Sequence, residues 1–338
     1  MQSQKSKRSS SSFFGVVVLF LLFAVAVGVI TQRQAIVDTV RASQYAPSSS
    51  EQSLQNDLAL TADGEFLFKA SQAQLQPAES FNKSCSQSRE TNNPILGCYS
   101  RQMIYIYTIN QEKLQGIEQT TAAHELLHAA YERMNDSEKN TVNAELQKAY
   151  EAHKTPKLEE RMAYYQKAEP GEELNELHSI LGTENSDLGD VLETHYKKYF
   201  TDRAKIVGYY AQYSKTFSDI AAQLENLQKA IAAQTNAVNA RIENYSTKID
   251  TLKADQAAFV AKNNRREFTS VSEFNSAQNA LNNRADALNG ERSAIQAAID
   301  EVNTLRAQYN DLATEYNQLN QSLNSTLPPT PTLSKAAV

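Results

Sequence analysis

A seven-residue repeat of apolar and aromatic side chains in the last third of the chain restricts its fold more than any other feature. Such a repeat places one side chain on the same stripe of a helix every two turns, and a second helix has to cover that stripe. The sequence therefore predicts a long helix within a coiled coil, followed by a flexible, proline-containing tail at residues 326–338. The repeating positions are Phe274, Leu281, Leu288, Ile295, Val302, Tyr309, Tyr316 and Leu323.

A partner for this helix precedes it in the chain. Between residues 220 and 259 apolar side chains recur three or four positions apart, with one irregular step between Ile231 and Val238. Helix propensity drops over residues 263–270, which end in a Thr-Ser pair suited to cap a new helix. We expect an antiparallel helical hairpin over residues 206–325. The pattern leaves open a coiled coil between chains, formed with a partner protein or a second copy.

An uncharged apolar run near the start of the chain, residues 13–30, predicts a membrane segment. A bilayer span needs at least about 17 such residues. Lys5, Lys7 and Arg8 precede the run, so the positive-inside rule places residues 1–12 in the cytoplasm and the rest of the chain outside it. We expect a single-pass anchor with an extracytoplasmic domain; a cleaved signal peptide is the alternative.

The two cysteines, Cys85 and Cys98, are the only ones in the chain. An exported domain lies in an oxidising compartment, where they can close a short loop as a disulfide. Two free thiols are the alternative.

The segment between the anchor and the hairpin is predicted to form a linker at residues 31–44 and an α+β domain at residues 45–205. Residues 66–70 and 103–109 are rich in aromatic or β-branched side chains and predict strands. A net charge of −6 with interspersed signs leaves no large basic surface, which excludes nucleic acid as the main partner. Helical spacing follows over residues 120–134, 137–153, 157–167, 172–182 and 190–203.

The sequence His124-Glu125-Leu126-Leu127-His128 is an H-E-x-x-H motif on one of these predicted helices. Residues four apart share a helix face, so His124 and His128 can bind one zinc ion together, with Glu125 beside it as the general base. A core helix with two hydrogen-bonded histidines is the alternative. Burying two histidines and a glutamate without a metal would be costly.

A later predicted helix carries Asn175-Glu176-Leu177-His178-Ser179. Together with the H-E-x-x-H motif, this segment resembles the gluzincins, the thermolysin-like clan of zinc metallopeptidases. In that clan a glutamate from a later helix, often in an Asn-Glu-x-x-Ser/Ala-Asp context, is the third ligand. The resemblance therefore implies a zincin-like catalytic domain with Glu176 as the third zinc ligand. In the family an aspartate often follows, and it is the usual partner of one of the ligand histidines. Here Ile180 stands at that position, and Glu184 is the candidate to replace the aspartate.

Glu173 and His178 are the alternatives for the third ligand. Glu173 lies one turn earlier on the same predicted helix, and His178 would make a three-histidine site. The metzincin pattern, with a third histidine and a glycine soon after the motif, is absent because Ala129-Ala130-Tyr131-Glu132-Arg133 follows.

The gluzincin resemblance also concerns substrate binding. It implies that the strand at residues 103–109 is the edge strand that pairs with an extended peptide, and an ordinary buried strand is the alternative. His195 and Tyr196 are residue types with which the clan stabilises the oxyanion, and packing aromatics are the alternative. His153, at a polar helix end, is interpreted as a surface residue.

These inferences predict a membrane-anchored zinc metalloendopeptidase acting on peptide or protein substrates. Glu125 would take a proton from a zinc-activated water and pass it to the leaving amine. The alternative is a non-catalytic coiled-coil scaffold of the cell envelope with a structural or inert metal site. A structural site would need a fourth protein ligand, which the sequence does not obviously offer.

Overall fold

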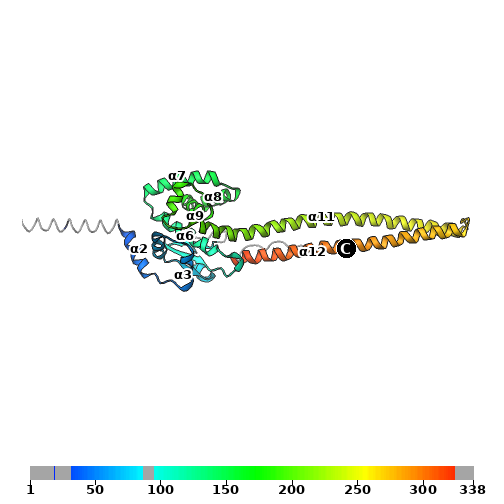
Figure 1. Cartoon of the computed structure of the whole chain (residues 1–338), viewed down its shortest axis with the longest axis horizontal. Coiled ribbons are helices and arrows are strands. Elements are labelled where there is room, and N and C mark those ends of the chain that lie inside the picture. The colour runs from blue at the N-terminus through cyan, green and yellow to red at the C-terminus, as the bar shows by residue number, and fades with distance from the viewer. Residues whose placement is uncertain (1–18, 20–31, 87–94, 324–338) are drawn as a thin grey trace, which may run out of the picture. The chain divides into compact units, whose positions relative to one another are not determined.

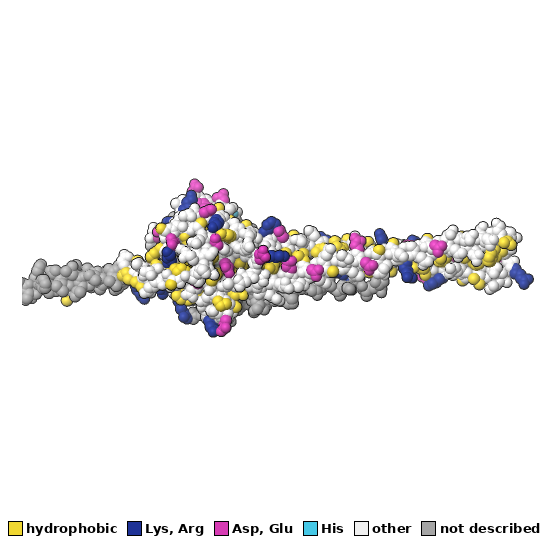
Figure 2. Space-filling model, turned by 60° about the horizontal axis from the view of Figure 1, so that its bottom comes forward, with side chains coloured by type: hydrophobic (Ala, Val, Ile, Leu, Met, Phe, Trp, Pro, Cys, Tyr) yellow, Lys and Arg dark blue, Asp and Glu magenta, His cyan; other side chains and the backbone are white. Residues whose placement is uncertain are grey.

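The computed structural model describes residue 19 and residues 32–86 and 95–323 (Figure 1). The chain divides into two compact units, the first ending at Ser214 and the second beginning at Lys215. This boundary falls within one long helix, α11 (Arg203–Asn264). On the face shown in Figure 2, acidic and basic side chains are interspersed, and no broad patch of one sign is present.

The first unit is built mainly from helices, so the expected α+β fold class is wrong. Its sheet has only three short strands, β1 (Gln74–Gln76), β2 (Gly97–Ser100) and β3 (Met103–Tyr107), in the order β1-β3-β2. Strand β3 pairs parallel with β1 and antiparallel with β2. The helices before the sheet's last strand are α2 (Arg33–Gln44), α3 (Ser49–Asp57), α4 (Ala62–Ala70) and α5 (Ala78–Ser84). Those after it are α6 (Ile117–Arg133), α7 (Asp136–His153), α8 (Pro156–Ala168), α9 (Glu173–Glu184) and α10 (Asp190–Tyr196), with a 3₁₀ turn at Glu112–Leu114.

Residues 66–70, predicted as a strand, form the second half of α4. The side chain of Thr61 accepts a hydrogen bond from the Gly64 N–H at 3.0 Å and thereby caps the helix. Gly64 is required by packing, because a Cβ built there would lie 2.2 Å from the carbonyl oxygen of Tyr199. A contact with a residue far along the chain therefore determines this helix, and local aromatic content could not reveal it.

Strands β2 and β3 form a hairpin closed by the two-residue turn Arg101-Gln102. Both residues have positive φ, 52° and 60°, as a tight hairpin turn requires. Arg41 of α2 holds the turn by donating to the backbone and side-chain oxygens of Gln102, both at 3.3 Å. Because β3 lies in the middle of the sheet, it is not the substrate-binding edge that the sequence suggested; the edge strand beside α6 is β2.

Helix α6 is the centre of the first unit's core and packs closely on α9. Its buried face is rich in alanine, which lets the two backbones approach each other. Gly182 of α9 continues this close packing, since a Cβ there would lie 2.5 Å from Leu127 of α6. The same contact turns the faces carrying His124, His128 and Glu176 toward each other.

Helix α2 occupies the segment expected to be a linker, and it packs against the rest of the first unit. Asp38 is buried and accepts hydrogen bonds from Arg133 Nε and Nη2, each at 2.8 Å. Arg133 is the last residue of α6. Gln34, one turn before Asp38, accepts a 2.9 Å hydrogen bond from the Gln102 side chain. Helix α2 thus connects the end of α6 to the turn of the β2–β3 hairpin.

The second unit is a helical hairpin, formed by α11 from Lys215 onward and by α12 (Val271–Leu323). The repeat positions Leu288, Ile295 and Val302 are buried, the last two against Val238 of α11. The two long helices expected from the repeat are therefore present. Their antiparallel pairing within one chain is marked by contacts along their length: Phe217 with Tyr316, Lys248 with Glu291, Asp255 with Arg284, and Lys262 with Glu273.

In residues 32–86 and 95–323 no helix combines the length and the apolar character needed to cross a membrane. The helices of sufficient length there, α7, α11 and α12, carry charged side chains along their sequences. Residues 13–30, on which the expected anchor rested, lie outside the described residues except for Leu19. The structure therefore does not support the single-pass membrane topology, and the localisation inferred from it is withdrawn.

Candidate metal centre

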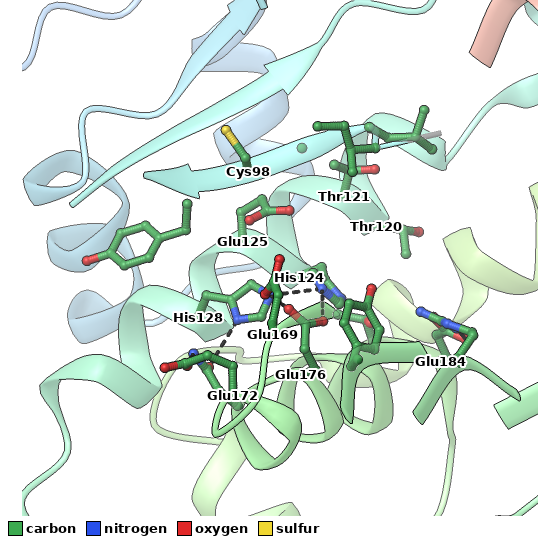
Figure 3. Close-up of a pocket in the computed structure, with 18 of the residues that line it drawn as sticks. Cys98, Thr120, Thr121, His124, Glu125, His128, Glu169, Glu172, Glu176 and Glu184 are labelled. Atoms are coloured by element: carbon green, nitrogen blue, oxygen red, sulfur yellow. Dashed lines mark hydrogen bonds and ion pairs between the residues drawn. The ribbon is translucent and has the colours of Figure 1, made fainter. Parts of the chain in front are cut away.

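His124 and His128 of α6 and Glu176 of α9 bring together three ligand atoms within 4.8 Å of one another (Figure 3). His128 Nε2 lies 3.0 Å from His124 Nε2 and 3.4 Å from Glu176 Oε1. His124 Nε2 lies 3.7 Å from Glu176 Oε2, which is beyond hydrogen-bonding distance. These three residues can hold a metal ion, and we call them the metal triad.

One buried oxygen of the metal triad has no hydrogen-bond partner among residues 32–86 and 95–323. Glu176 is only 8% exposed, and its Oε2 has no hydrogen-bond partner. Leaving a buried carboxylate oxygen without a donor is costly, and a cation at this point removes the cost. Two imidazole nitrogens and one carboxylate oxygen form a ligand set that suits zinc and leaves a fourth position open. The residues present therefore fit a zinc ion.

Asn175 determines which nitrogen of His128 faces the metal triad. Its Nδ2 donates to a carboxylate oxygen of Glu172 at 3.0 Å, and a carboxylate only accepts. The Asn175 Oδ1 must then be the atom that lies 3.0 Å from His128 Nδ1, and it accepts the proton on that nitrogen. In the neutral ring this leaves Nε2 unprotonated and free to bind a metal.

Charges around the metal triad keep Glu176 ionised. Burial opposes ionisation, but His128 and then His124 outweigh it and lower the pKa of Glu176 to about 2. Burial also opposes protonation of both histidines. It prevails at His124, whose pKa is lowered, whereas Glu176, Glu125 and Asn175 together raise the pKa of His128. The centre thus pairs an ionised carboxylate with one histidine that readily takes a positive charge.

Glu125 lies on the side of α6 that faces β2 (Figure 3). The backbone N–H of Tyr99 on β2 donates a hydrogen bond to its carboxylate. Gly97 makes this approach possible, because a Cβ there would lie 2.6 Å from Thr121 and 2.7 Å from Glu125. Burial raises the pKa of Glu125 to about 8. Glu125 is therefore a buried carboxyl group next to the metal triad, poised to exchange a proton near neutral pH.

The metal triad opens into a cleft of about 1020 Å³, large enough for several residues of a peptide. One wall is β2 with the residues before it, and the floor is α6. The opposite wall comes from α8, α9 and the loop between them, together with Tyr210 and Tyr213 of α11. All of these residues belong to the first unit.

The alternatives for the third ligand lie away from the metal triad. Glu173 accepts a hydrogen bond from the Gly171 N–H, and His178 is fully buried with its Nε2 2.9 Å from His195 Nε2. Glu184 lines the cleft but is paired with Arg161 at 2.7 and 2.9 Å. The partner of His128 is therefore Asn175, and Glu184 does not take that part.

His195 and Tyr196 are buried and do not line the cleft. Tyr196 donates to the carbonyl oxygen of His178 at 2.7 Å, and His195 contacts the ring of that residue. Both are thus part of a packed aromatic group, as the alternative interpretation had it. Nothing places them within reach of a substrate oxyanion.

Two residues of the cleft escaped the sequence analysis. Asn175 precedes the third ligand within the Asn-Glu pair, so its position was visible although its role was not. Glu169 lies in the loop between α8 and α9, and no motif distinguishes it from the other glutamates of that region.

A disulfide joins Cys85, directly after α5, to Cys98 of β2. Cys98 is buried with Phe81 and Tyr105 while also bordering the cleft. The bond ties the edge strand to the helix on the other side of the sheet. It thereby holds the strand that contacts Glu125.

Comparisons with known proteins give no relationship for this chain. No family model matches the sequence, and no curated protein or solved structure matches it significantly. Its function is therefore inferred from its own residues and their geometry.

Proposed function

We propose that this chain is a zinc-dependent peptidase similar to the gluzincins. The observation that carries the proposal is the convergence of His124, His128 and Glu176 in one cleft, with Glu125 directly beside them. A ligand set of two histidines and one glutamate leaves room for a substrate or a water molecule, as catalytic zinc sites do. The unsatisfied Oε2 of Glu176 supports a resident cation at this point.

Zinc, when bound, supplies Lewis acidity that polarises the scissile carbonyl, lowers the pKa of a water molecule and favours the ionised form of Glu125. Glu125 is held by the Tyr99 N–H and accepts the proton of the attacking water. It then donates that proton to the leaving amine. Two linked hydrogen bonds, from Asn175 to Glu172 and from His128 to Asn175, hold His128 in the tautomer whose Nε2 can bind the metal.

Strand β2 is suited to bind an extended peptide along its open edge. Tyr107 N–H bonds to Leu96 O across the hairpin, so alternate residues, Cys98 and Ser100, also face β3. The backbone groups of Gly97 and Tyr99 therefore face away from the sheet. The Tyr99 N–H is occupied by Glu125, so a peptide would pair with the Gly97 backbone and the Tyr99 carbonyl and would lie beside Glu125, in the manner of strand addition.

The decisive experiment measures bound zinc and peptide cleavage on the same protein samples. Wild type should bind one zinc ion per chain and cleave an unstructured peptide mixture. Glu125→Gln should keep the zinc and lose cleavage, whereas Glu176→Ala should lose zinc affinity and cleavage together. Glu173→Gln is the matched control and should behave as wild type, because Glu173 lies on the same helix but accepts its hydrogen bond from the Gly171 N–H, away from the ligands.

Two outcomes would contradict the proposal. A wild-type protein that takes up no zinc would be a helical scaffold carrying an inert motif. Full cleavage by Glu125→Gln would show that the centre does not act through this carboxylate.

A further inference from the structure

Glu169 is a half-buried acid of the cleft. It follows the last turn of α8, where its backbone N–H bonds to Tyr165 O. Within residues 32–86 and 95–323, its carboxylate forms no hydrogen bond or ion pair. Its charge acts on Glu176, His128 and Glu125, and Figure 3 shows its side chain directed toward the metal triad.

Glu169 is not a ligand of the same metal ion. Among the described residues, the group of ligand atoms within 4.8 Å comprises only His124, His128 and Glu176. A fourth protein ligand at that distance would close the site, whereas three ligands leave the open position that catalysis needs. The carboxylate of Glu169 is half-buried and forms no hydrogen bond or ion pair with the described residues, so its partner is to be sought in the substrate.

The rest of the cleft has an excess of negative charge. Seven glutamates line it, against the three cations Arg101, Lys157 and Arg161. Arg161 is already paired with Glu184. Two positive charges from a zinc ion still leave the carboxylates in excess, so the field in the cleft attracts cations and repels anions.

Aromatic rings add a second attraction for a cation. Five tyrosines line the same cleft, and Tyr165 lies one turn before Glu169, at the end of α8. The faces of such rings attract ammonium and guanidinium groups. A carboxylate beside tyrosine rings therefore favours an organic cation.

We propose that Glu169 binds a positively charged group of the substrate, so that the cleft selects peptides with a cation next to the scissile bond. The cation is either a lysine or arginine side chain or the free α-amino group of the peptide. This inference rests on the proposed peptidase function. It goes beyond that function because it names the substrate class and the residue that selects it.

Binding to an inactive protein tests the proposal separately from cleavage. The full chain carrying Glu125→Gln is loaded with zinc, and its affinity for matched fluorescent peptides is measured by anisotropy. The peptides differ only in Lys against Gln at one position, and in a free against an acetylated N-terminus. We expect the cationic peptides to bind about tenfold to hundredfold more tightly than their neutral counterparts, as a charged hydrogen bond predicts.

Adding Glu169→Gln should abolish this preference and leave the affinity for neutral peptides unchanged. Glu169→Asp should retain part of it, which separates a lost charge from a disturbed fold. Glu159→Gln removes the same charge from an exposed position of α8 outside the cleft and should retain the full preference. The comparison of Lys with Gln peptides tests for a bound side chain, and the comparison of free with acetylated N-termini tests for a bound α-amino group.

Equal binding of cationic and neutral peptides, or a preference that survives Glu169→Gln, would overturn the inference even if the wild type cleaves peptides. A preference that depends on Glu169 in a protein that cleaves nothing would support cation recognition while refuting the peptidase. The two proposals can therefore fail separately.

Discussion

Replacing Asn175 with alanine should weaken zinc binding without removing any ligand. The substitution deletes the acceptor that lies 3.0 Å from His128 Nδ1, together with the link through Asn175 Nδ2 to Glu172. The ring of His128 can then place its proton on either nitrogen and rotate more freely. Outer partners of metal-binding histidines typically contribute about tenfold to hundredfold in affinity.

The structure sets the size of the Asn175→Ala effect within that range. One hydrogen bond to a group of this kind contributes about 0.5–1.5 kcal/mol, and the freedom regained by the ring adds to it. A loss of tenfold to hundredfold corresponds to about 1.4–2.7 kcal/mol. His128 is 8% exposed, so water cannot easily replace the missing acceptor, and we expect a value in the upper half of this range.

Competition with a chelating dye measures the zinc affinity of Asn175→Ala. Asn143→Ala is the control, because it also removes a partly buried hydrogen bond, the one from Tyr131, but one that involves no metal ligand. Asn175→Asp keeps an acceptor for Nδ1–H and should lose less affinity than the alanine variant. Zinc affinity of Asn175→Ala within twofold of wild type would refute the assignment of the His128 tautomer.

Two further predictions concern the first unit. Asp38→Asn should destabilise it by about 3–5 kcal/mol in urea unfolding, because the guanidinium of Arg133 is left without its buried counter-charge; a change below about 1 kcal/mol would contradict the link between α2 and α6. Burial lowers the pKa of His195 to about 4 from an ordinary 6.5, so the unfolded chain takes up a proton that the folded chain refuses. Stability should therefore fall by roughly 3 kcal/mol as pH falls from 6.5 to 4. His195→Gln should reduce that dependence in unfolding curves taken across this pH range, while buried His178, whose pKa is also lowered, keeps the remainder. An unchanged slope would contradict the lowered pKa of His195.

The elements that follow from periodicity were predictable from the sequence. The repeat from Phe274 to Leu323 specifies a long helix because its stripe continues unbroken over many turns. The helix of the H-E-x-x-H motif was equally clear, and the spacing of His124 and His128 alone places both on one face. Glu176 was accessible only through resemblance, since no local pattern joins it to a motif on another helix.

The errors arose where distant contacts decide the structure. Residues 66–70 have strand-like composition, but the cap at Thr61 and the contact of Gly64 with Tyr199 make them helical. The order of strands in the sheet is a property of pairing, so residues 103–109 gave no sign that β3 is central. The pairing of Arg161 with Glu184 and the isolation of Glu169 likewise depend on how α8 and α9 meet.

Helix α2 shows that the working unit extends beyond the residues that form the cleft. It contributes no side chain to the cleft, yet through Asp38 and Arg41 it fixes the end of α6 and the turn between β2 and β3. A truncation that begins at Tyr45 would retain every cleft residue and lose this fixation. Zinc binding and cleavage measured on such a fragment would describe a metal triad whose supporting helix and strand are held less firmly. Expression fragments of this protein should therefore begin before Arg33.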